Sequence, residues 1–505
     1  MKIKSIAAAC AALCTVSAFA APLDPTASTV TPTSYLTYYI TGASAQATAV
    51  TNVVAGLNPD GTFGTSQFFA TPSDVVTITQ SCPSAYTPNC DKVTMRYGIA
   101  IAGGSIPANQ PLLVIYNSAD GSFSGMNQMA NLGGSDAALA DYVNGITFNS
   151  DGTVSFAAQG LFHGYVPVLG AGLVLSGSGT SYTTTEQAFN GDANTVGVPN
   201  AHFAFVKADI ALADVHAFEN VPGAFGPGQA GFQTAGNITS KTIGLETFGV
   251  AVNPALYSAL QVAQNIAQTT PGTADLATTK IPNIRSIDYA SMIAQSGKTK
   301  SAAALLSNYQ TTASTDGTKI TVERRIDLSG TQASSGIFFL DNPCGKGASN
   351  PSTDVNSNSK IAYVLNSQTG DVTTALKSTN TPGYAIGIVS LEKNQALTAN
   401  SYNFIKLDGV SPNYSATGTY DAKGRANTSK GDYKYAVEMT ANFDKTNTNV
   451  VHTTFGTNFV TGLTNSTLHD LTGVSYLDGA DKSNNKQAHY DHGGASNCKP
   501  LIANQ

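Results

Sequence analysis

The sequence contains no tryptophan, few charged residues and no long apolar run after its N-terminal segment. Asp, Glu, Lys and Arg make up 11% of the 505 residues, and the formal net charge is -6. Only 26 residues are Lys or Arg and they form no basic tract, which argues against nucleic-acid binding. A transmembrane helix needs roughly 20 consecutive apolar residues. We therefore expect no transmembrane segment once the N-terminal segment is removed.

The first twenty residues have the pattern of a secretory signal peptide. Lysines within residues 1–4 precede an apolar run over residues 6–16, and residues 18–20 form a small-x-small cleavage site. Cleavage before Ala21 would leave a periplasmic or secreted (extracellular) protein. Residues 21–35, rich in Pro, Ser and Thr, are predicted to form a flexible lead-in.

Cysteine is scarce, and no CxxC pair suggests a zinc site. After the signal segment the chain has four cysteines: Cys82, Cys90, Cys344 and Cys498. In an oxidising compartment an even number of cysteines is expected to pair, and four cysteines allow three pairings. The short, proline-containing segment between the first two favours a local bridge, which leaves Cys344 to pair with Cys498. Zinc binding is the weaker alternative.

A strand followed by a Gly- or Ser-rich turn and a helix is predicted three times. The three units cover residues 34–57, 111–132 and 319–340, with turns at 41–44, 117–125 and 324–331. Repeated strand-to-helix turns indicate an α/β protein that binds its ligand at the carboxyl ends of strands.

The third turn carries the residues best suited to bind an oxyanion. Unpaired N–H groups and the helix dipole favour an anion at a helix start. Arg325 can bind an oxyanion through two N–H groups, and Ser329, Gly330 and Thr331 add hydroxyl and amide donors. Asp327 is expected to orient the Arg325 guanidinium. The turn therefore predicts an oxyanion-binding loop.

Asp209 is a candidate acceptor for the proton of an oxyanion. Hydrogen phosphate carries such a proton at neutral pH and sulfate does not, so a carboxylate at this point would discriminate between them. The competing interpretation makes Asp209 the N-cap of a helix over residues 210–215. The local sequence alone favours this structural role.

Six motifs, in order along the chain, resemble those of the periplasmic phosphate-binding proteins of ABC transporters. The segment RRIDLSGT at 324–331 is similar to the family's R-x-D-x-S-G-T. The others are ITGAS at 40–44, the Tyr116 turn at 116–125, KADIAL at 207–212, TPGYAIG at 381–387 and DGVSP at 408–412. The resemblance implies a two-lobed type II periplasmic-binding-protein fold, with a hinge and a ligand cleft between the lobes.

The same resemblance implies a set of ligand-binding residues. Phosphate or a related oxyanion would contact the oxyanion-binding loop, Asp209 would accept its proton, and the first two turns would contribute Ser44, Gln46, and Ser122 or Ser124. Two departures stand out, because Gln46 occupies the place of a family threonine and Phe123 separates the serines. The family's partner is an ABC permease. We expect no metal and no cofactor.

The domain boundaries follow from the same comparison. Residues 36–245 are predicted to form the first part of lobe 1, residues 246–410 lobe 2, and residues 411–505 a return to lobe 1 plus a C-terminal extension. The chain is longer than the family it resembles, with extra sequence around residues 60–110, 150–200 and 440–505. These segments are expected to be insertions.

Three functions are compatible with these observations. The first is a non-enzymatic receptor for a phosphate-like oxyanion, and the second is a secreted or cell-surface scaffold for adhesion or matrix assembly. The third is a secreted phosphatase, because the resemblance extends to relatives linked with that activity. A triad hydrolase has little support, since the scattered histidines have no partnered nucleophile. The cluster His489, Asp491 and His492 is interpreted as a solvated loop rather than a metal site.

Overall fold

A computed structural model describes most of the chain outside the predicted signal segment. The described residues are 22–31, 33–57, 62–63, 66–81, 93–103, 105–118, 121–130, 146–148, 154–156, 165–167, 169–170, 173, 175–185, 203–205, 208–216, 238–294, 301–326, 329–345, 351–352, 360–366, 368–377, 383–445, 447–465, 468–477, 486–494 and 496–503. Cys82, Cys90 and Asp327 lie outside these ranges, as does the side chain of Ser124.

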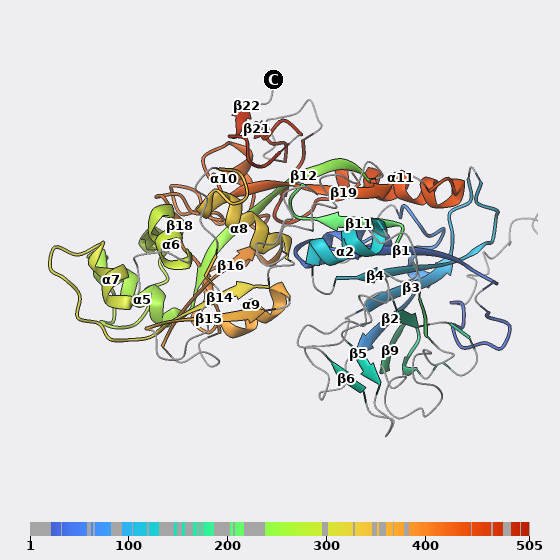
Figure 1. Ribbon diagram of the computed structural model, residues 1–505, viewed down its shortest axis with the longest axis horizontal. Helices are drawn as coiled ribbons and strands as arrows, with labels where there is room; N and C mark the ends of the chain where they lie inside the picture. The colour runs from blue at the N-terminus through green and yellow to red at the C-terminus, as the bar shows by residue number, and fades with distance from the viewer. Residues whose placement is uncertain are drawn as a thin grey trace, which may run out of the picture.

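One large mixed sheet dominates the described part of the chain (Figure 1). Its strands, in spatial order, are β15 (Ile361–Asn366), β14 (Ile320–Arg325), β16 (Tyr384–Ser390), β12 (Ile238–Val252), β19 (Ala436–Asp444), β11 (Ile210–Ala213), β1 (Leu36–Gly42), β4 (Pro111–Asn117), β3 (Val93–Ile99), β2 (Val76–Ser81), β9 (Ser181–Thr185) and β8 (Ser176–Ser178). Two short strands, β17 (Asn403–Phe404) and β20 (Val474–Ser475), also pair with β12.

Strand β12 belongs to two sections of this sheet. Its residues from Ile238 to Thr247 pair with β19, and its residues from Phe248 to Val252 pair with β16. Figure 1 shows β14, β15 and β16 on one side of β12, and β1, β4, β3 and β2 on the other. The two sections are therefore joined through one continuous strand.

Helices cover both sections. They are α1 (Ala47–Ala55), α2 (Gly121–Ala130), α5 (Pro254–Ala263), α6 (Ser286–Ile293), α7 (Ala302–Ser307), α8 (Gly330–Leu340), α9 (Thr369–Ala375), α10 (Ala426–Ser429) and α11 (Val450–Thr464). None of the helices in the described ranges is both long and apolar enough to cross a membrane. Small two-stranded sheets pair β13 (Asn283–Ile284) with β18 (Lys406–Leu407), β21 (Tyr490–Asp491) with β22 (Ile502–Ala503), β5 (Ile146–Phe148) with β6 (Val154–Phe156), and β7 (Tyr165–Pro167) with β10 (Phe203–Phe205).

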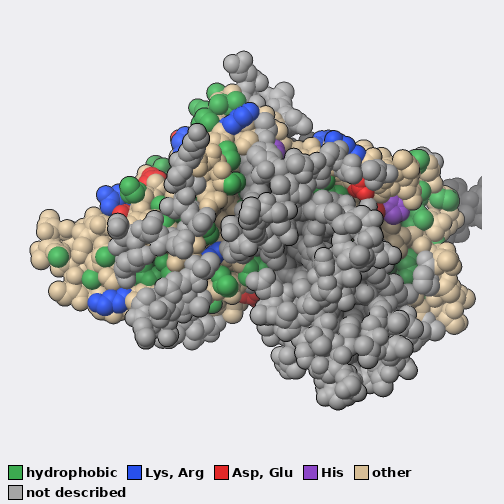
Figure 2. Space-filling view, viewed as in Figure 1, with side chains coloured by type: hydrophobic (Ala, Val, Ile, Leu, Met, Phe, Trp, Pro, Cys, Tyr) green, Lys and Arg blue, Asp and Glu red, His purple; other side chains and the backbone are tan. Residues whose placement is uncertain are grey.

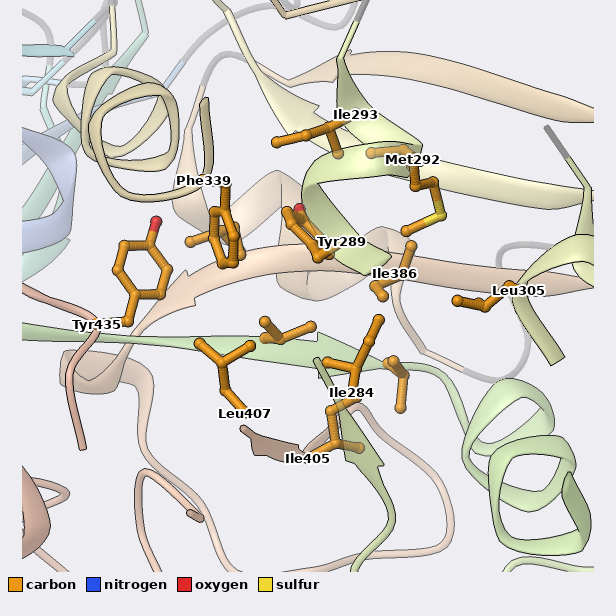
Figure 3. Close-up of a cluster of buried hydrophobic side chains, with 14 of the residues drawn as sticks. Ile284, Tyr289, Met292, Ile293, Leu305, Phe339, Ile386, Ile405, Leu407 and Tyr435 are labelled. Atoms are coloured by element: carbon orange, nitrogen blue, oxygen red, sulfur yellow. The ribbon is translucent and has the colours of Figure 1, made fainter. Parts of the chain in front are cut away.

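Each section of the sheet has its own hydrophobic core. In the first section, Tyr38 and Ile40 of β1 pack on one face and Tyr39 packs on the other. A strand that is parallel to both neighbours and buried on both faces needs apolar residues in succession, as β1 has. The core of the second section gathers residues of α6, α8, β16 and the β13–β18 pair, among them Tyr289, Phe339 and Ile386 (Figure 3).

The three predicted strand–turn–helix units are confirmed as β1 with α1, β4 with α2, and β14 with α8. Two local predictions were wrong. Helix α2 begins at Gly121, so the predicted turn at Ser122 is the first turn of the helix. Residues 210–213 form strand β11 instead of a helix, because they pair with β1 and β19.

Two glycines in the first section allow β11 and α2 to lie close to the end of β1. Gly42 ends β1 with φ +115°, and a Cβ there would lie 2.0 Å from the carbonyl oxygen of Leu212. Gly125 of α2 packs directly on it, since a Cβ on Gly125 would lie 2.5 Å from the Gly42 Cα. The pair of glycines therefore allows α2 to lie against the end of β1.

The C-terminal segment is tied to the rest of the molecule by a disulfide and by a buried carboxylate. Cys344, just after α8, and Cys498 are joined by an S–S bond, the long-range pairing expected from the sequence. Glu438 of β19 accepts hydrogen bonds from the N–H groups of His492 (2.6 Å) and Gly494 (3.1 Å). His492 is thus buried against β19, and the prediction of a solvated loop there was wrong.

Candidate functional site

Asp214 is the centre of a buried polar site at the carboxyl end of β11. The Asp214 N–H donates to the Ser122 hydroxyl at 3.2 Å, and the Thr331 hydroxyl donates to Asp214 Oδ2 at 3.0 Å. Gln46 Nε2 lies 3.4 Å from Asp214 Oδ1 and donates to the Ala213 carbonyl at 3.2 Å. Asp214 therefore connects residues from three separate strand-to-helix units.

The sequence places Asp214 there through the register of β11. Strand β11 is parallel to β1, with Ile210 beside Ile40 and Leu212 beside Gly42. The residue that follows Ala213 consequently emerges at the same edge of the sheet as the turn after β1. That turn begins with the 3-10 helix η1 (Ser44–Gln46), which carries Gln46 toward Asp214.

Asp209 does not belong to this site. It precedes β11, at the opposite end of the strand, where its Oδ2 accepts a hydrogen bond from the Tyr39 N–H at 2.7 Å. Its other carboxylate oxygen contacts His452 Nδ1 of α11. Asp209 therefore does not lie beside Ser122 and Thr331 as the resemblance implied, whereas Asp214, five residues later, does.

Arg325 lies at the carboxyl end of β14, almost completely buried. Its Nε donates to the Asn366 carbonyl at 3.1 Å, and its Nη1 donates to the Thr369 hydroxyl at 3.0 Å. Strand β15 and helix α9 thus hold the guanidinium in place. Its positive charge acts on Asp214 and lowers the pKa of that carboxyl.

The start of α8 meets Asp214 and Ser122 directly. A Cβ on Gly330 would lie 2.2 Å from the Ser122 hydroxyl oxygen and 2.9 Å from the Asp214 Cβ, so this close approach requires glycine. Ser329 is the N-cap residue but makes no side-chain capping hydrogen bond. The N–H groups of the first turn have no intrahelical acceptor, as in any α-helix. They are therefore suited to bind an anion.

The sequence-predicted residues are only partly brought together. Gln46, Ser122, Gly330 and Thr331 meet around Asp214, and Arg325 acts on it through its charge. Ser44 is buried in η1 and its hydroxyl has no hydrogen-bond partner.

Burial changes the acid–base behaviour of Asp214. Loss of water around the carboxyl raises its pKa from 3.8 to about 6, against the lowering effects of the Thr331 hydrogen bond and the Arg325 charge. The carboxyl is therefore close to the point at which it gains or loses a proton under mildly acidic conditions.

Stability should depend on pH through Asp214. Because its pKa is raised to about 6 on folding, its contribution to stability is fully present below pH 3.8 and is lost as the pH rises through about 6. The loss for this one group is about 2–3 kcal/mol. Urea unfolding followed by circular dichroism between pH 4.5 and 7.5 should show this decline. Asp214→Asn should reduce it, and the remainder should come from Glu246 and Glu392, whose pKa values burial also raises.

The control for this measurement is Asp432→Asn, which replaces an exposed carboxylate. It should keep the pH dependence of the unmodified protein. Equal slopes for the two variants would show that Asp214 does not contribute to it.

A pocket beside the site gives access to Arg325 and Thr331. It is small, with room for about one water molecule. Its walls include Tyr289, Ile293, Arg324, Arg325, Thr331 and Tyr363. Arg325 and Thr331 therefore line a small space whose walls do not include Asp214.

On the face in view in Figure 2, Lys and Arg side chains lie apart from one another over the described surface. The described residues also contain no group of three His, Cys, Asp or Glu side chains placed to hold a metal ion.

Comparisons with known proteins give distant structural likenesses. No family model and no curated protein matches the chain. One similar solved structure is a possible phosphate binding protein from Planctomyces limnophilus, with 14% identity, a TM-score of 0.25, and coverage of 47% of this chain and 64% of that one. Another is an ABC-type phosphate transport receptor from Vibrio cholerae, with 13% identity, a TM-score of 0.29, and coverage of 52% of this chain and 75% of that one.

Proposed function

We propose that this chain is an exported, non-enzymatic solute-binding protein that binds phosphate or a related oxyanion between Arg325 and Asp214. The observation that carries the proposal is that the start of α8 contacts the buried Asp214 carboxyl through Thr331, while the charge of the buried Arg325 guanidinium acts on the same carboxyl. The three groups come from different segments of the chain. Together they supply positive charge, N–H donors and one acceptor.

Each group has a separate task in binding. Arg325 and the first-turn N–H groups of α8 neutralise and hold the anion, and the hydroxyls of Ser122 and Thr331 donate to its oxygens. Asp214 accepts a hydrogen bond from an oxyanion that carries a proton. A fully deprotonated anion such as sulfate has no such proton and would meet the carboxylate with repulsion, which favours phosphate.

Ligand entry requires a rearrangement of the contacts seen here. The Thr331 hydroxyl bonds to Asp214, and Gly330 touches Ser122. Because α8 belongs to one section of the sheet and Asp214 to the other, an oxyanion would enter as the two sections separate. We place the hinge in β12 between Thr247 and Phe248, where its partner changes from β19 to β16.

This mechanism corresponds to two lobes of a type II periplasmic-binding-protein fold. Residues 36–245 and 411–505 would form one lobe and residues 246–410 the other. A binding protein of this kind delivers its ligand to an ABC permease, which we propose as the partner.

Arg325→Ala tests the proposal by titration calorimetry on protein that has been unfolded, stripped of phosphate and refolded. Loss of the charged hydrogen bonds should weaken phosphate binding roughly 10- to 100-fold, corresponding to about 1.5–3 kcal/mol. Arg285→Ala is the matched control, since Arg285 is half exposed and pairs with Asp288 away from the site. Absence of heat with phosphate, sulfate, arsenate and phosphate esters would contradict the proposal.

The packing of the site also favours a second function. Thr331 bonds to Asp214 and Gly330 packs against Ser122, so residues expected to bind an oxyanion contact one another instead, as expected for a secreted or cell-surface scaffold that has lost anion binding. Such a scaffold for adhesion or matrix assembly would show no anion binding. It would also fold and assemble normally after Arg325→Ala.

A further inference from the structure

Three buried carboxyl groups, Asp214 among them, act on one another through their charges. The other two are Glu246 of β12 and Glu392, which lies in the 3-10 helix η6 (Leu391–Lys393). Asp214 and Glu246 are 1% exposed as residues, and the Glu392 side chain is 4% exposed. Burial, with the charges of the other two carboxyls, raises the pKa of Glu246 well above its usual value.

The three carboxyls do not have equal partners. Glu392 accepts hydrogen bonds from the N–H and hydroxyl of Thr48 and pairs with Lys393 at 3.0 Å. Asp214 accepts from Thr331 and experiences the charge of Arg325. Glu246 Oε2, by contrast, is buried and has no hydrogen-bond partner. Glu246, in β12, is therefore the least compensated of the three carboxyls.

A neutral side chain shows the same deficit of donors. Gln46 is 1% exposed, and its Nε2 points at Asp214, which places its amide beside the carboxyl cluster. Its Oε1 is buried without a partner. A buried acceptor without a donor costs about 1–3 kcal/mol, so Gln46 and Glu246 independently indicate a missing donor.

The missing donor should carry positive charge and several N–H groups. Among the described residues, no three His, Cys, Asp or Glu side chains are placed so that they could hold one metal ion. A primary ammonium has three divergent N–H donors and makes hydrogen bonds that are longer than metal–oxygen bonds. It could therefore reach acceptors that are too far apart to share one metal ion.

We propose that the ligand of this site carries a primary ammonium as well as an oxyanion, as aminoalkyl phosphonates and phosphate esters of amino alcohols do. The ammonium donates to Glu246 and Gln46, while the oxyanion lies against Arg325 and the start of α8. Asp214 lies between these two positions, since its Oδ2 faces Thr331 and its Oδ1 faces Gln46. The inference rests on the proposed function, because it adds a second group to the same ligand.

Charge balance favours this ligand over inorganic phosphate. Phosphate alone would bring further negative charge toward three buried carboxyls, where repulsion is poorly screened. A ligand with its positive end at the carboxyls and its negative end at Arg325 matches both halves of the site.

The test compares two ligands that differ only in the amino group, 2-aminoethylphosphonate and ethylphosphonate, by calorimetry at pH 7.5. On the unmodified protein, the amino compound should bind at least about tenfold more tightly. O-phosphoethanolamine should likewise bind more tightly than inorganic phosphate. Glu246→Gln should remove the advantage of the amino compound over ethylphosphonate, whereas Asp432→Asn should keep it.

The outcomes separate this inference from the proposed function. If both phosphonates bind equally to the unmodified protein, the ammonium position is wrong and oxyanion binding stands. The same holds if Glu246→Gln, shown to be folded by circular dichroism, keeps the full advantage. If no compound binds, the proposed function fails and this inference fails with it. The comparison on unmodified protein remains decisive even if Glu246→Gln does not fold.

Discussion

Removing the disulfide between Cys344 and Cys498 should lower the free energy of unfolding by about 3–5 kcal/mol. The bond joins residues 154 positions apart, and a crosslink that closes so long a loop removes much of the conformational freedom of the unfolded chain. Urea unfolding of the double variant Cys344→Ser/Cys498→Ser, followed by circular dichroism because the chain has no tryptophan, measures the effect.

Lys499→Ala is the control for this variant. It changes an exposed residue next to the bond and should alter stability by no more than about 0.5 kcal/mol. A double variant that unfolds within about 1 kcal/mol of the unmodified protein would show that the bond adds little to the packing of the C-terminal segment on β19.

Gly42→Ala should destabilise the protein by about 3–5 kcal/mol. The backbone at Gly42 has φ +115°, which strains any residue with a Cβ, and the added atom would lie 2.0 Å from the Leu212 carbonyl oxygen. Strain of this kind costs on the order of 1–3 kcal/mol and overpacking about as much again. Since β1 and β11 are hydrogen-bonded neighbours, relief would require the strands to move apart.

Gly272→Ala separates the two causes. Gly272 has φ +79° but nothing within 4 Å of its Cβ position, so only backbone strain applies. It should cost about 1 kcal/mol. Equal losses in the two variants, measured by thermal and urea unfolding, would mean that the contact with Leu212 relaxes freely.

The strand–turn–helix units were predicted correctly where the polar turn residues and the apolar residues on either side indicated the same boundaries. The turn from Arg325 to Gly330 has an apolar strand before it and an apolar helix after it, so its position could be read directly. The same holds for β1 with α1 and for β4. These elements follow from short-range patterns, which tertiary packing then reinforces.

The choice between Asp209 and Asp214 failed for a physical reason. Both aspartates follow an alanine, and the four apolar residues between them fit a buried strand as well as a turn of helix. Only the pairing of β11 with β1 and β19 decides between the two, and that pairing is not a local property. Had the run been taken as a strand, its carboxyl end would have pointed to Asp214.

The acidic half of the site could not be found from local sequence at all. Glu246 and Glu392 are far apart along the chain, and neither lies in a motif that predicts a shared site; only Gln46 was among the sequence-predicted residues. They meet because β12 runs through both sections of the sheet. The sequence of β12 does not reveal that this strand joins both sections, because its change of partner depends on β16 and β19, which come much later in the chain.

The position of β19 has a consequence for the order of folding. It lies between β11 and β12, and Ile210 of β11 pairs with Phe443, so the middle of the sheet contains a strand from near the end of the chain. Until that strand arrives, β11 and β12 each keep an unpaired edge that can join another chain. Pairings over such sequence separations form slowly. Productive folding therefore requires that the edges of β11 and β12 pair with no other strand until β19 takes its place between them.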